Sequence, residues 1–345
     1  MKQKSVLIGM SGGVDSSVAA ALLKEQGYHV IGATMRLWTY SDSCNMKHEG
    51  CCAESAVEDA RRVCDKLGID FYVMNFKDMF KDKVVDYFVD EYIHGRTPNP
   101  CIACNKYLKF DALLKKALAM GIDYVATGHY AKIEKGEDGK YILRASEAVK
   151  KDQSYVLYNF TQEQLAHTLM PLGGYNKDWV RQKAEELGLG VAHKPDSQEI
   201  CFVEDDDYAK FITDYSGYKP KEGDILDVNG NVIGKHRGLI YYTIGQRKGI
   251  GAYGRPMFVM KIDAENNTIT LGEKGMEFSN ELTAYDVNFV SGEFPKENML
   301  ITAKVRYQAP PAAAMLCPQK DGTVKLMFPE PQRAVTPGQA VVFYD

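Results

Sequence analysis

A turn rich in glycine and serine near the start of the chain has the residue types and spacing of an anion-binding site. It reads Ser11-Gly12-Gly13-Val14-Asp15-Ser16-Ser17 and lies between the apolar run 5–10 and an apolar helical pattern over 18–23. Backbone N–H groups point into a strand–turn–helix junction of this kind, and the helix dipole adds positive charge there. Because Gly12 and Gly13 carry no side chain, an oxyanion can approach the backbone closely. The turn therefore predicts a phosphate cradle.

Asp15 distinguishes this turn from commoner phosphate loops. A carboxylate would repel a bare phosphate, so we expect Asp15 to hold Mg2+ or to orient water, with the hydroxyls of Ser16 and Ser17 as donors. The turn lacks the Gly-Lys-Ser/Thr of a Walker loop and the spacing GxGxxG. It resembles the pyrophosphate loop (PP-loop) of enzymes that cleave ATP to AMP and pyrophosphate in order to adenylate an oxygen. The alternative is an ordinary glycine turn capped by its serines.

Three cysteines lie in contexts that suit sulfur chemistry. Cys101 and Cys104 follow the loop Pro98-Asn99-Pro100, just before a helix predicted over 106–120, and Cys201 lies in a loop that enters an apolar run. A place near a helix N-terminus, with Lys106 close by, should favour the thiolate form of Cys104. The C-x-x-C spacing is also compatible with half of a zinc site or with a redox dithiol, but no second pair with that spacing is present. We favour sulfur transfer.

The remaining cysteines give weaker signals. Cys64 lies on an apolar helical face and is predicted to be core, and Cys317 is predicted to pack within a β region. A polar loop holds four possible metal ligands, which are compatible with a metal knuckle or with simple loop thiols: Cys44, His48, Cys51 and Cys52.

The elements that must position these residues alternate between strand and helix in the first half of the chain, as in a parallel, doubly wound sheet. Strands are predicted over 5–10, 28–35, 69–75 and 123–127, and helices from 18 and over 54–67, 78–93, 106–120 and 178–187. Such sheets bind ligands at the carboxyl ends of their strands, where Met10-Ser11 and Thr127-Gly128-His129 lie. From about residue 215 the pattern predicts β structure, with a hairpin around Asn229-Gly230 and strands over 303–307, 324–328 and 340–344.

Bulk properties bound the class of protein. A chain of 345 residues is long enough for about two or three domains, and 45% hydrophobic with 26% charged residues indicates a globular protein. No apolar run reaches the length of a membrane span, and the N-terminus lacks a signal-peptide layout. We therefore expect a cytoplasmic protein with no membrane partner, in which eight cysteines indicate catalysis, metal binding or burial. The net charge of −4 gives no global sign of nucleic acid but is compatible with a local basic groove.

A series of motifs resembles the tRNA-specific 2-thiouridylase (MnmA) family, a group of PP-loop enzymes. The motifs follow the family's order across nearly the whole chain: residues 9–17, 95–100, Cys104-Asn105-Lys106, 126–130, 151–155, Asp196-Ser197, Ile200-Cys201-Phe202, 245–249 and 335–339. The resemblance implies that ATP, with Mg2+, adenylates the C2 oxygen of the wobble uridine U34 in the tRNAs for lysine, glutamate and glutamine. Sulfur then replaces that oxygen, giving 2-thiouridine, AMP and pyrophosphate.

The resemblance also implies roles for individual residues. Cys201 would carry a persulfide received from a sulfur donor such as a cysteine desulfurase or a relay protein. Cys104 would then free hydrosulfide or close a Cys104–Cys201 disulfide, and Asp15 would assist catalysis. ATP would contact Gly9, Met10, Ser11, Gly12, Gly13, Val14, Asp15, Ser16, Met35 and Gly128. The target base would lie against Asn99, Pro100 and Cys101. The tRNA would contact His129, Lys151, Asp152, Gln153, Arg306, Tyr307 and Gln339.

The chain departs from the family pattern at two places. Many members have Asp where this chain has Cys101, so an acid/base role there is in doubt. Cys101, Cys104 and Cys201 could instead hold a [4Fe–4S] cluster whose fourth iron carries hydrosulfide. The family usually continues past Asp345 with another glycine-rich strand, and the absence of that strand is compatible with an open barrel edge or a shortened chain.

We therefore expect an α/β protein in three parts. A doubly wound, Rossmann-like catalytic domain of the adenine nucleotide α-hydrolase type would span 1–213. A small β-rich connector would span 214–276, and a C-terminal β-barrel that contacts tRNA would span 277–345. The alternatives are another PP-loop ligase or amidotransferase that acts on a small molecule, and a non-catalytic tRNA-binding iron–sulfur protein.

Overall fold

The computed structural model describes residues 3–38, 54–196, 200–203 and 206–345. The proposed metal knuckle of Cys44, His48, Cys51 and Cys52 lies outside these residues, as does Ser197. The chain divides into two compact units that interleave in sequence. The first comprises Met1–Val84, Cys101–Val203 and Asn288–Glu293, and the second comprises Val85–Pro100, Glu204–Val287 and Phe294–Asp345.

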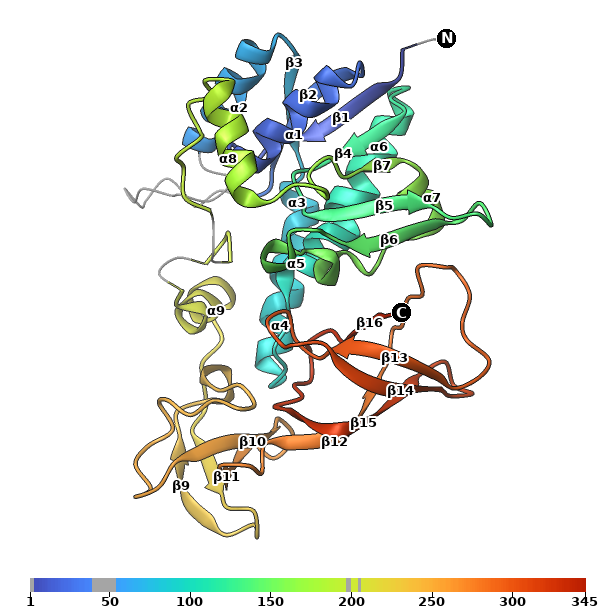
Figure 1. Cartoon of the computed structure of the whole chain (residues 1–345). Coiled ribbons are helices and arrows are strands. Elements are labelled where there is room, and N and C mark those ends of the chain that lie inside the picture. The colour runs from blue at the N-terminus through green and yellow to red at the C-terminus, as the bar shows by residue number, and fades with distance from the viewer. Residues whose placement is uncertain (1–2, 39–53, 197–199, 204–205) are drawn as a thin grey trace. The chain divides into compact units, whose positions relative to one another are not determined.

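A five-stranded parallel sheet forms the centre of the first unit (Figure 1). Its strands, in spatial order, are β3 (Asp70–Asn75), β2 (His29–Arg36), β1 (Ser5–Gly9), β4 (Tyr124–Ala126) and β7 (Thr168–Leu169). Val6, Leu7 and Ile8 are fully buried, as expected for a central parallel strand covered on both faces. The strand order reverses between β1 and β4, and doubly wound sheets bind their ligands at such a switch point. The predicted doubly wound α/β fold is confirmed.

Three helices share one hydrophobic core with this sheet, and the first of them contacts the other two. They are α1 (Val14–Glu25), α2 (Glu54–Leu67) and α8 (Lys177–Glu186), which Figure 1 shows gathered near β1. Ala19 and Ala20 of α1 are fully buried, because their small side chains let the neighbouring helices approach closely. Cys64 is also fully buried, and burial raises the pKa of its thiol to about 12, so it is an inert core residue as predicted.

Two helices begin earlier than the sequence pattern indicates. α1 begins at Val14 rather than at residue 18. The helix predicted over 106–120 begins at Pro100 and runs through α5 (Pro100–Ala103), η2 (Cys104–Ala112) and α6 (Leu113–Ala119). Proline suits the first helical position because its fixed φ is already helical and its missing N–H is not needed there. Cys104 therefore begins the second turn of the helix, one turn further in than the sequence pattern indicates.

Smaller elements complete the first unit and begin the second. The helix predicted over 78–93 forms as α3 (Lys77–Phe80), η1 (Lys81–Asp86) and α4 (Tyr87–Ile93). A hairpin of β5 (Ala131–Lys135) and β6 (Tyr141–Ala145) precedes the short helices η3 (Val149–Lys151), η4 (Ser154–Leu157) and α7 (Gln162–Ala166). The structure describes no helix with the length and apolar character needed to cross a membrane.

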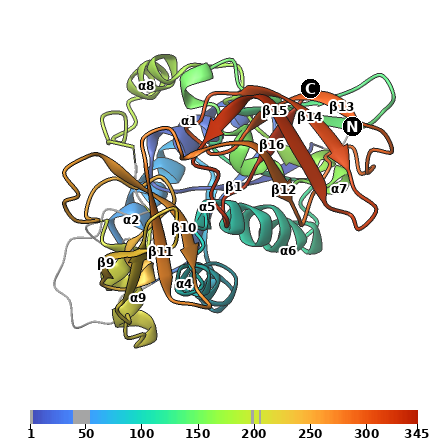
Figure 2. The ribbon, with the colours of Figure 1, turned by 90° about the horizontal axis from the view of Figure 1, so that it is seen from below.

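The second unit is mainly β structure (Figure 2). After α9 (Tyr208–Ser216), four strands form one sheet: β8 (Gly223–Leu226), β9 (Val232–His236), β10 (Met257–Asp263) and β11 (Thr268–Glu273), with η5 (Leu239–Tyr241) between them. Five more form a second sheet: β12 (Phe278–Ala284), β13 (Met299–Lys304), β14 (Ala312–Pro318), β15 (Val324–Arg333) and β16 (Val342–Tyr344). The predicted hairpin joins β8 to β9, with Gly230 at φ 86°. The strand predicted over 303–307 forms earlier, over β13.

Candidate active site

The glycine turn (11–17) joins β1 to α1 and includes the first turn of the helix. Gly13 is the N-cap residue and offers no side chain to the first N–H groups of α1. The hydroxyl of Ser17 donates to the carbonyl oxygen of Gly13 (2.8 Å), and the Ser16 hydroxyl lies 3.2 Å from the Ser11 hydroxyl. Ser17 is fully buried, so it stabilises the turn and is not available to a ligand. The turn can bind an anion through its backbone.

Two glycines at this site are required by close approach of other backbone segments. A Cβ on Gly12, whose φ is +69°, would lie 2.3 Å from the carbonyl oxygen of Ala56 in α2. A Cβ on Gly128, after β4, would lie 2.6 Å from the backbone nitrogen of Ser16. Because backbone atoms cannot move aside, only glycine fits at either position. Gly128 therefore lies directly against Asp15 and Ser16.

The other predicted ATP contacts are mostly buried side chains. Met10 and Val14 are each 2% exposed, so only their backbone could reach a nucleotide. Met35 lies partly buried in β2, next to the end of the strand, where it pairs with Met74 of β3. Gly9 ends β1 and is paired with Ala33. These residues surround the switch point, where Ser11 is exposed and Asp15 is partly exposed.

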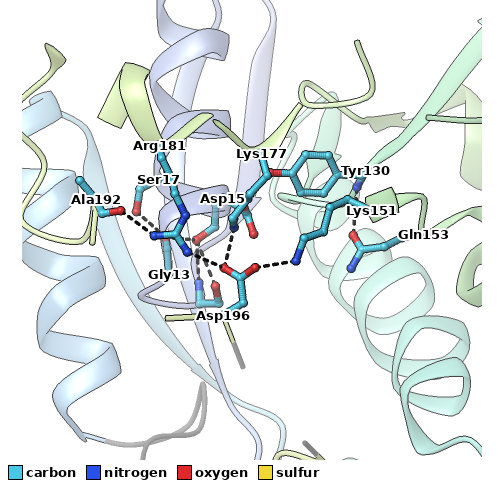
Figure 3. Close-up of polar contacts among 12 residues, drawn as sticks. Gly13, Asp15, Ser17, Tyr130, Lys151, Gln153, Lys177, Arg181, Ala192 and Asp196 are labelled. Carbon is cyan, nitrogen blue, oxygen red and sulfur yellow. Dashed lines mark hydrogen bonds and ion pairs between the residues drawn. The ribbon is translucent and has the colours of Figure 1, made fainter. Parts of the chain in front are cut away.

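Asp15 accepts two hydrogen bonds from residues that are distant in sequence (Figure 3). The hydroxyl of Tyr130 donates to Asp15 Oδ1 (2.7 Å), and Lys177 Nζ lies 2.6 Å from the same oxygen. Tyr130 is 2% exposed, and burial together with the nearby Asp15 charge raises the pKa of its phenol. Tyr130 therefore remains a proton donor to Asp15.

Asp196 forms ion pairs with three cationic side chains, one of which also contacts Asp15 (Figure 3). Its carboxylate oxygens lie 2.8 Å from Lys151 Nζ, 2.7 Å from Lys177 Nζ and 3.4 Å from an Arg181 nitrogen. Burial alone would raise the pKa of Asp196, but hydrogen bonds from Lys151 and Lys177 outweigh it, and the pKa lies below its usual value. Asp196 is thus ionised and joins Lys151 to Lys177, which in turn contacts Asp15.

The predicted tRNA residues of the first unit lie around Tyr130. Gln153 forms hydrogen bonds with both backbone groups of this residue. Its side-chain oxygen accepts from the Tyr130 N–H (3.0 Å), and its backbone N–H donates to the Tyr130 carbonyl oxygen (2.9 Å). Asp152 accepts from the Ser154 hydroxyl (2.7 Å) and shapes its loop. His129 Nδ1 lies 2.7 Å from the Thr127 hydroxyl, and burial, followed by the Lys109 charge, holds its pKa well below 6.5. A contact of His129 with tRNA would therefore involve a neutral imidazole.

Cys201 is exposed, while the residue that follows it is anchored in the core. Phe202 is 1% exposed, and its ring centroid lies 5.6 Å from that of Phe80 and 6.4 Å from that of Trp38. Trp38 follows closely after β2, so Phe202 packs beside the carboxyl end of that strand. The packing positions an exposed thiol on the first unit, which also carries the glycine turn.

The other two site cysteines lie on one helix but differ in burial. Cys101 is exposed in the first turn, whereas Cys104 is 8% exposed at the start of the π-helical segment η2. Asn105 fixes this segment by donating to the carbonyl oxygen of Val156 (3.0 Å). Among the described residues, which include Cys101, Cys104 and Cys201, no three Cys, His, Asp or Glu side chains gather as they would around a metal ion. This arrangement of the three thiols does not fit a cluster site, and we derive no step through one.

The second unit brings two distant predicted segments together. Gln339 Nε2 donates to the carbonyl oxygen of Thr97 (2.7 Å), and the Thr97 N–H donates to the Pro337 carbonyl (2.9 Å). Gln339 therefore lies beside the loop that carries Asn99 and Pro100. Arg306 is held by structural contacts, because one guanidinium nitrogen donates to the carbonyl oxygens of Ile244 (2.9 Å) and Ala334 (2.6 Å) and to the Thr336 hydroxyl. Its neighbour Tyr307 is 38% exposed, with Lys304 Nζ 5.7 Å from its ring centroid.

Several residues of the site had no role in the sequence-based prediction. Lys177 and Arg181 come from α8, and Lys194 donates to the carbonyl oxygen of Gly12 (3.2 Å) while pairing with Asp59 (2.8 Å). One signal was available in the sequence: Lys177 follows the helix cap Asn176, and a cation at that end opposes the helix dipole. Such a lysine needs a carboxylate partner, but the sequence does not say which one.

Comparison with known proteins gives full-length matches. Family models match residues 4–205 (tRNA methyl transferase HUP domain), 209–273 (tRNA methyl transferase PRC-barrel domain) and 279–345 (aminomethyltransferase beta-barrel domain). A protein named tRNA-specific 2-thiouridylase MnmA from Acetivibrio thermocellus is 59% identical over 100% of this chain and 97% of its own length. A protein of the same name from Clostridioides difficile is 58% identical over 99% of this chain and 95% of its own. A solved 4-thiouridine synthetase–RNA complex with bound ATP is 19% identical, with a TM-score of 0.37 over 58% of this chain and 45% of that chain.

Proposed function

The chain belongs to the tRNA-specific 2-thiouridylase (MnmA) family, and we propose that it is itself an ATP-dependent tRNA-uridine 2-sulfurtransferase. In this proposal it adenylates the C2 oxygen of U34 in the tRNAs for lysine, glutamate and glutamine. Sulfur then replaces the activated oxygen, and the products are 2-thiouridine, AMP and pyrophosphate. We place the reaction in the cytoplasm, where ATP and tRNA are both available.

The observation that carries the proposal is the phosphate turn at the switch point of the parallel sheet. The turn presents backbone N–H groups at the start of α1, and Gly128 closes against it from β4. Such a site favours the phosphates of ATP. When Mg2+ is bound with ATP, it would add charge neutralisation, and Asp15 is the carboxylate of this turn that could hold it. The C2 oxygen of a uridine is a poor leaving group, and adenylation converts it into AMP.

The sulfur step is proposed for two cysteines of the same unit. Cys201 receives a terminal sulfur from a protein donor such as a cysteine desulfurase or a relay protein and becomes a persulfide. The terminal sulfur attacks C2 and AMP leaves, after which the Cys104 thiolate attacks Cys201 Sγ. The Cys201 S–S bond breaks with its electron pair on the transferred sulfur, and a Cys104–Cys201 disulfide forms. Attack of Cys104 on the persulfide before transfer, which frees hydrosulfide, gives the same product.

The other predicted contacts complete this proposal. Asn99, Pro100 and Cys101 would flank the target base, while two groups of residues would hold the tRNA. The first group is His129, Lys151, Asp152 and Gln153, and the second is Arg306, Tyr307 and Gln339. Extruding a uridine from the anticodon loop costs little because that loop is already single-stranded.

Other readings of the same site predict different products. The family models carry a methyltransferase description, but methyl transfer does not need a phosphate turn that binds ATP for cleavage. A PP-loop ligase acting on a small carboxylate would need neither Cys104 nor Cys201. A non-catalytic iron–sulfur protein would bind tRNA without releasing pyrophosphate, and anaerobic purification would recover iron, sulfide and a broad visible absorbance with it.

The decisive assay mixes the full chain with ATP, Mg2+, sulfide and unmodified tRNA, followed by nuclease digestion and mass spectrometry. We expect 2-thiouridine at the wobble position, together with AMP and pyrophosphate. If pyrophosphate is released but no 2-thiouridine forms on any of the three tRNAs, the proposed function is wrong.

Substitution of Cys201 tests the sulfur route within the same assay. We expect Cys201→Ser to lose thiolation when sulfur is supplied by a persulfide-donor protein, and to retain part of it with high free sulfide. Cys317→Ser is the matched control, because Cys317 lies in β14 of the second unit. Equal thiolation by Cys201→Ser and the wild type with the protein donor would contradict the persulfide role.

A further inference from the structure

Lys177 occupies a position that the family resemblance and the comparisons leave without a role. Its side chain is only 11% exposed, and its ammonium lies between two carboxylates, 2.6 Å from Asp15 Oδ1 and 2.7 Å from Asp196 Oδ1. One of these carboxylates belongs to the phosphate turn. Lys177 is therefore the cation that the fold places directly on the acidic residue of the turn.

At the start of α8, the position of Lys177 is unfavourable for a cation unless carboxylates compensate it. Lys177 is the first residue of the helix, after the N-cap Asn176, whose side chain accepts from the Trp179 N–H (2.8 Å). The helix dipole disfavours a cation at this end. A largely buried ammonium carries an additional desolvation cost unless it is paired. Both costs are offset only because Asp15 and Asp196 surround the ammonium.

Asp196 holds the Lys177 ammonium through Oδ1. It is itself held by Lys151 (2.8 Å) and by Arg181 (3.4 Å), so it stays ionised and in place. Tyr130 donates to the same Asp15 oxygen that Lys177 contacts. Asp15 is thus fixed in position and has its charge countered before any ligand arrives.

This arrangement bears on how a polyphosphate can enter the turn. The backbone N–H groups of α1 attract phosphate, but an uncompensated Asp15 beside them would repel it, because like charges at close range are unfavourable in a partly buried site. We propose that Lys177 is a positioning residue that neutralises Asp15 at the phosphate turn and so allows the triphosphate to bind. The identity of the ligand as ATP rests on the proposed function, whereas the ion-pair bridge does not.

The test compares binding of α,β-methylene-ATP, which cannot be cleaved between the α- and β-phosphates, to four full-length proteins by calorimetry without Mg2+, so that the Mg2+ proposed for Asp15 does not enter the comparison. Lys177→Met is expected to weaken binding about tenfold or more, as for loss of one partner of a paired, largely buried charge. Lys177→Arg keeps the cation and should bind within a few-fold of the wild type. Lys183→Met is the matched control: Lys183 lies on the same helix and pairs with Glu25 of α1 (2.9 Å), away from the turn.

A double variant separates charge neutralisation from a merely structural role. If Lys177 acts by cancelling the charge of Asp15, then Asp15→Asn combined with Lys177→Met should recover most of the lost affinity. A loss of folding would not be recovered in this way, and thermal unfolding of each variant records it separately.

Two outcomes would overturn the inference: analogue binding by Lys177→Met that matches Lys183→Met, or a weakened Lys177→Met that Asp15→Asn does not restore. The wild type's 2-thiouridine yield is measured in parallel. If the wild type binds the analogue and the variants behave as expected, but no 2-thiouridine forms, the proposed function fails while the role of Lys177 stands.

Discussion

Single side chains at this site have their protonation states set by burial and by partners distant in sequence. Burial and the nearby Asp15 keep Tyr130 protonated, while hydrogen bonds from two lysines keep Asp196 ionised. His129 shows the effect of burial on a base: its imidazole is neutral in the folded chain because a buried imidazolium would lose its hydration. Each of these states follows from the surroundings of the residue rather than from its type.

The neutral His129 predicts a pH dependence of stability. Because the pKa of His129 is lower in the folded chain than the ordinary 6.5, the unfolded chain binds the proton first as the pH falls. The free energy of unfolding should therefore decrease from pH 7 to pH 5, by about 1–2 kcal/mol from this residue. His129→Gln should remove that part of the slope in urea unfolding followed by tryptophan fluorescence.

A histidine elsewhere in the first unit provides the control for this measurement. The side chain of His193 is 87% exposed, so His193→Gln should leave the pH dependence of unfolding as it is in the wild type. If His129→Gln and the wild type lose stability in parallel between pH 7 and pH 5, His129 does not remain neutral in the folded chain.

At the scale of elements, the site depends on how closely two strand ends approach the first turn of a helix. β1 delivers the glycine turn, and the segment after β4 brings Gly128 against the backbone of Asp15 and Ser16. α8, which lies far from α1 in sequence, supplies Lys177 and Arg181. Three separate elements therefore meet at the N-terminus of α1, and small residues at the contacts permit it.

Gly128→Ala tests this contact. The added Cβ would lie 2.6 Å from Ser16 N and 2.8 Å from the Asp15 carbonyl carbon, so the turn must shift. We expect a loss of about 1–3 kcal/mol in the free energy of unfolding, with weaker binding of the non-cleavable ATP analogue. Gly190→Ala is the control, since no atom lies within 4 Å of a Cβ built there. Equal analogue binding by both variants would show that the approach of Gly128 does not shape the nucleotide site.

At the scale of the molecule, the chain forms two compact units whose segments interleave. Residues 85–100 belong to the unit that carries the β-rich part, where Thr97 is held by Pro337 and Gln339. The proposed target-base residues Asn99 and Pro100 are therefore positioned by the end of the chain, whereas the phosphate turn is built within the other unit. The division into domains at 1–213, 214–276 and 277–345 remains a proposal, and limited proteolysis can test it.

Gly338→Ala should separate base positioning from nucleotide binding. Its φ is +91°, and a Cβ there would lie 2.7 Å from Thr97 N, so the loop with Asn99 must move. We expect a lower yield of 2-thiouridine, while binding of the ATP analogue remains as in the wild type. Gly322→Ala is matched in backbone strain, with φ +84°, but has no atom within 4 Å of the added Cβ. If both variants thiolate tRNA equally, the loop is not positioned through this contact.

The sequence by itself determined the doubly wound fold, the phosphate turn and the core role of Cys64. These follow from local signals: apolar runs of strand length, helical periodicity, and glycines at a strand–helix junction. The helix starts were less predictable, because Pro100 is equally compatible with a rigid loop and with the first position of a helix. Cys104 was therefore predicted near the start of a helix, and it lies at the beginning of the second turn.

Only the tertiary structure decided which side chains share the site with Asp15. Tyr130, Lys177 and Asp196 lie more than a hundred residues from it in sequence, and each comes from a different segment. The sequence specifies the charges but not their pairing, because pairing depends on which elements the sheet order and helix packing bring together. For the same reason Arg306, which the sequence resemblance assigned to tRNA, is found holding three backbone and hydroxyl groups of its own unit.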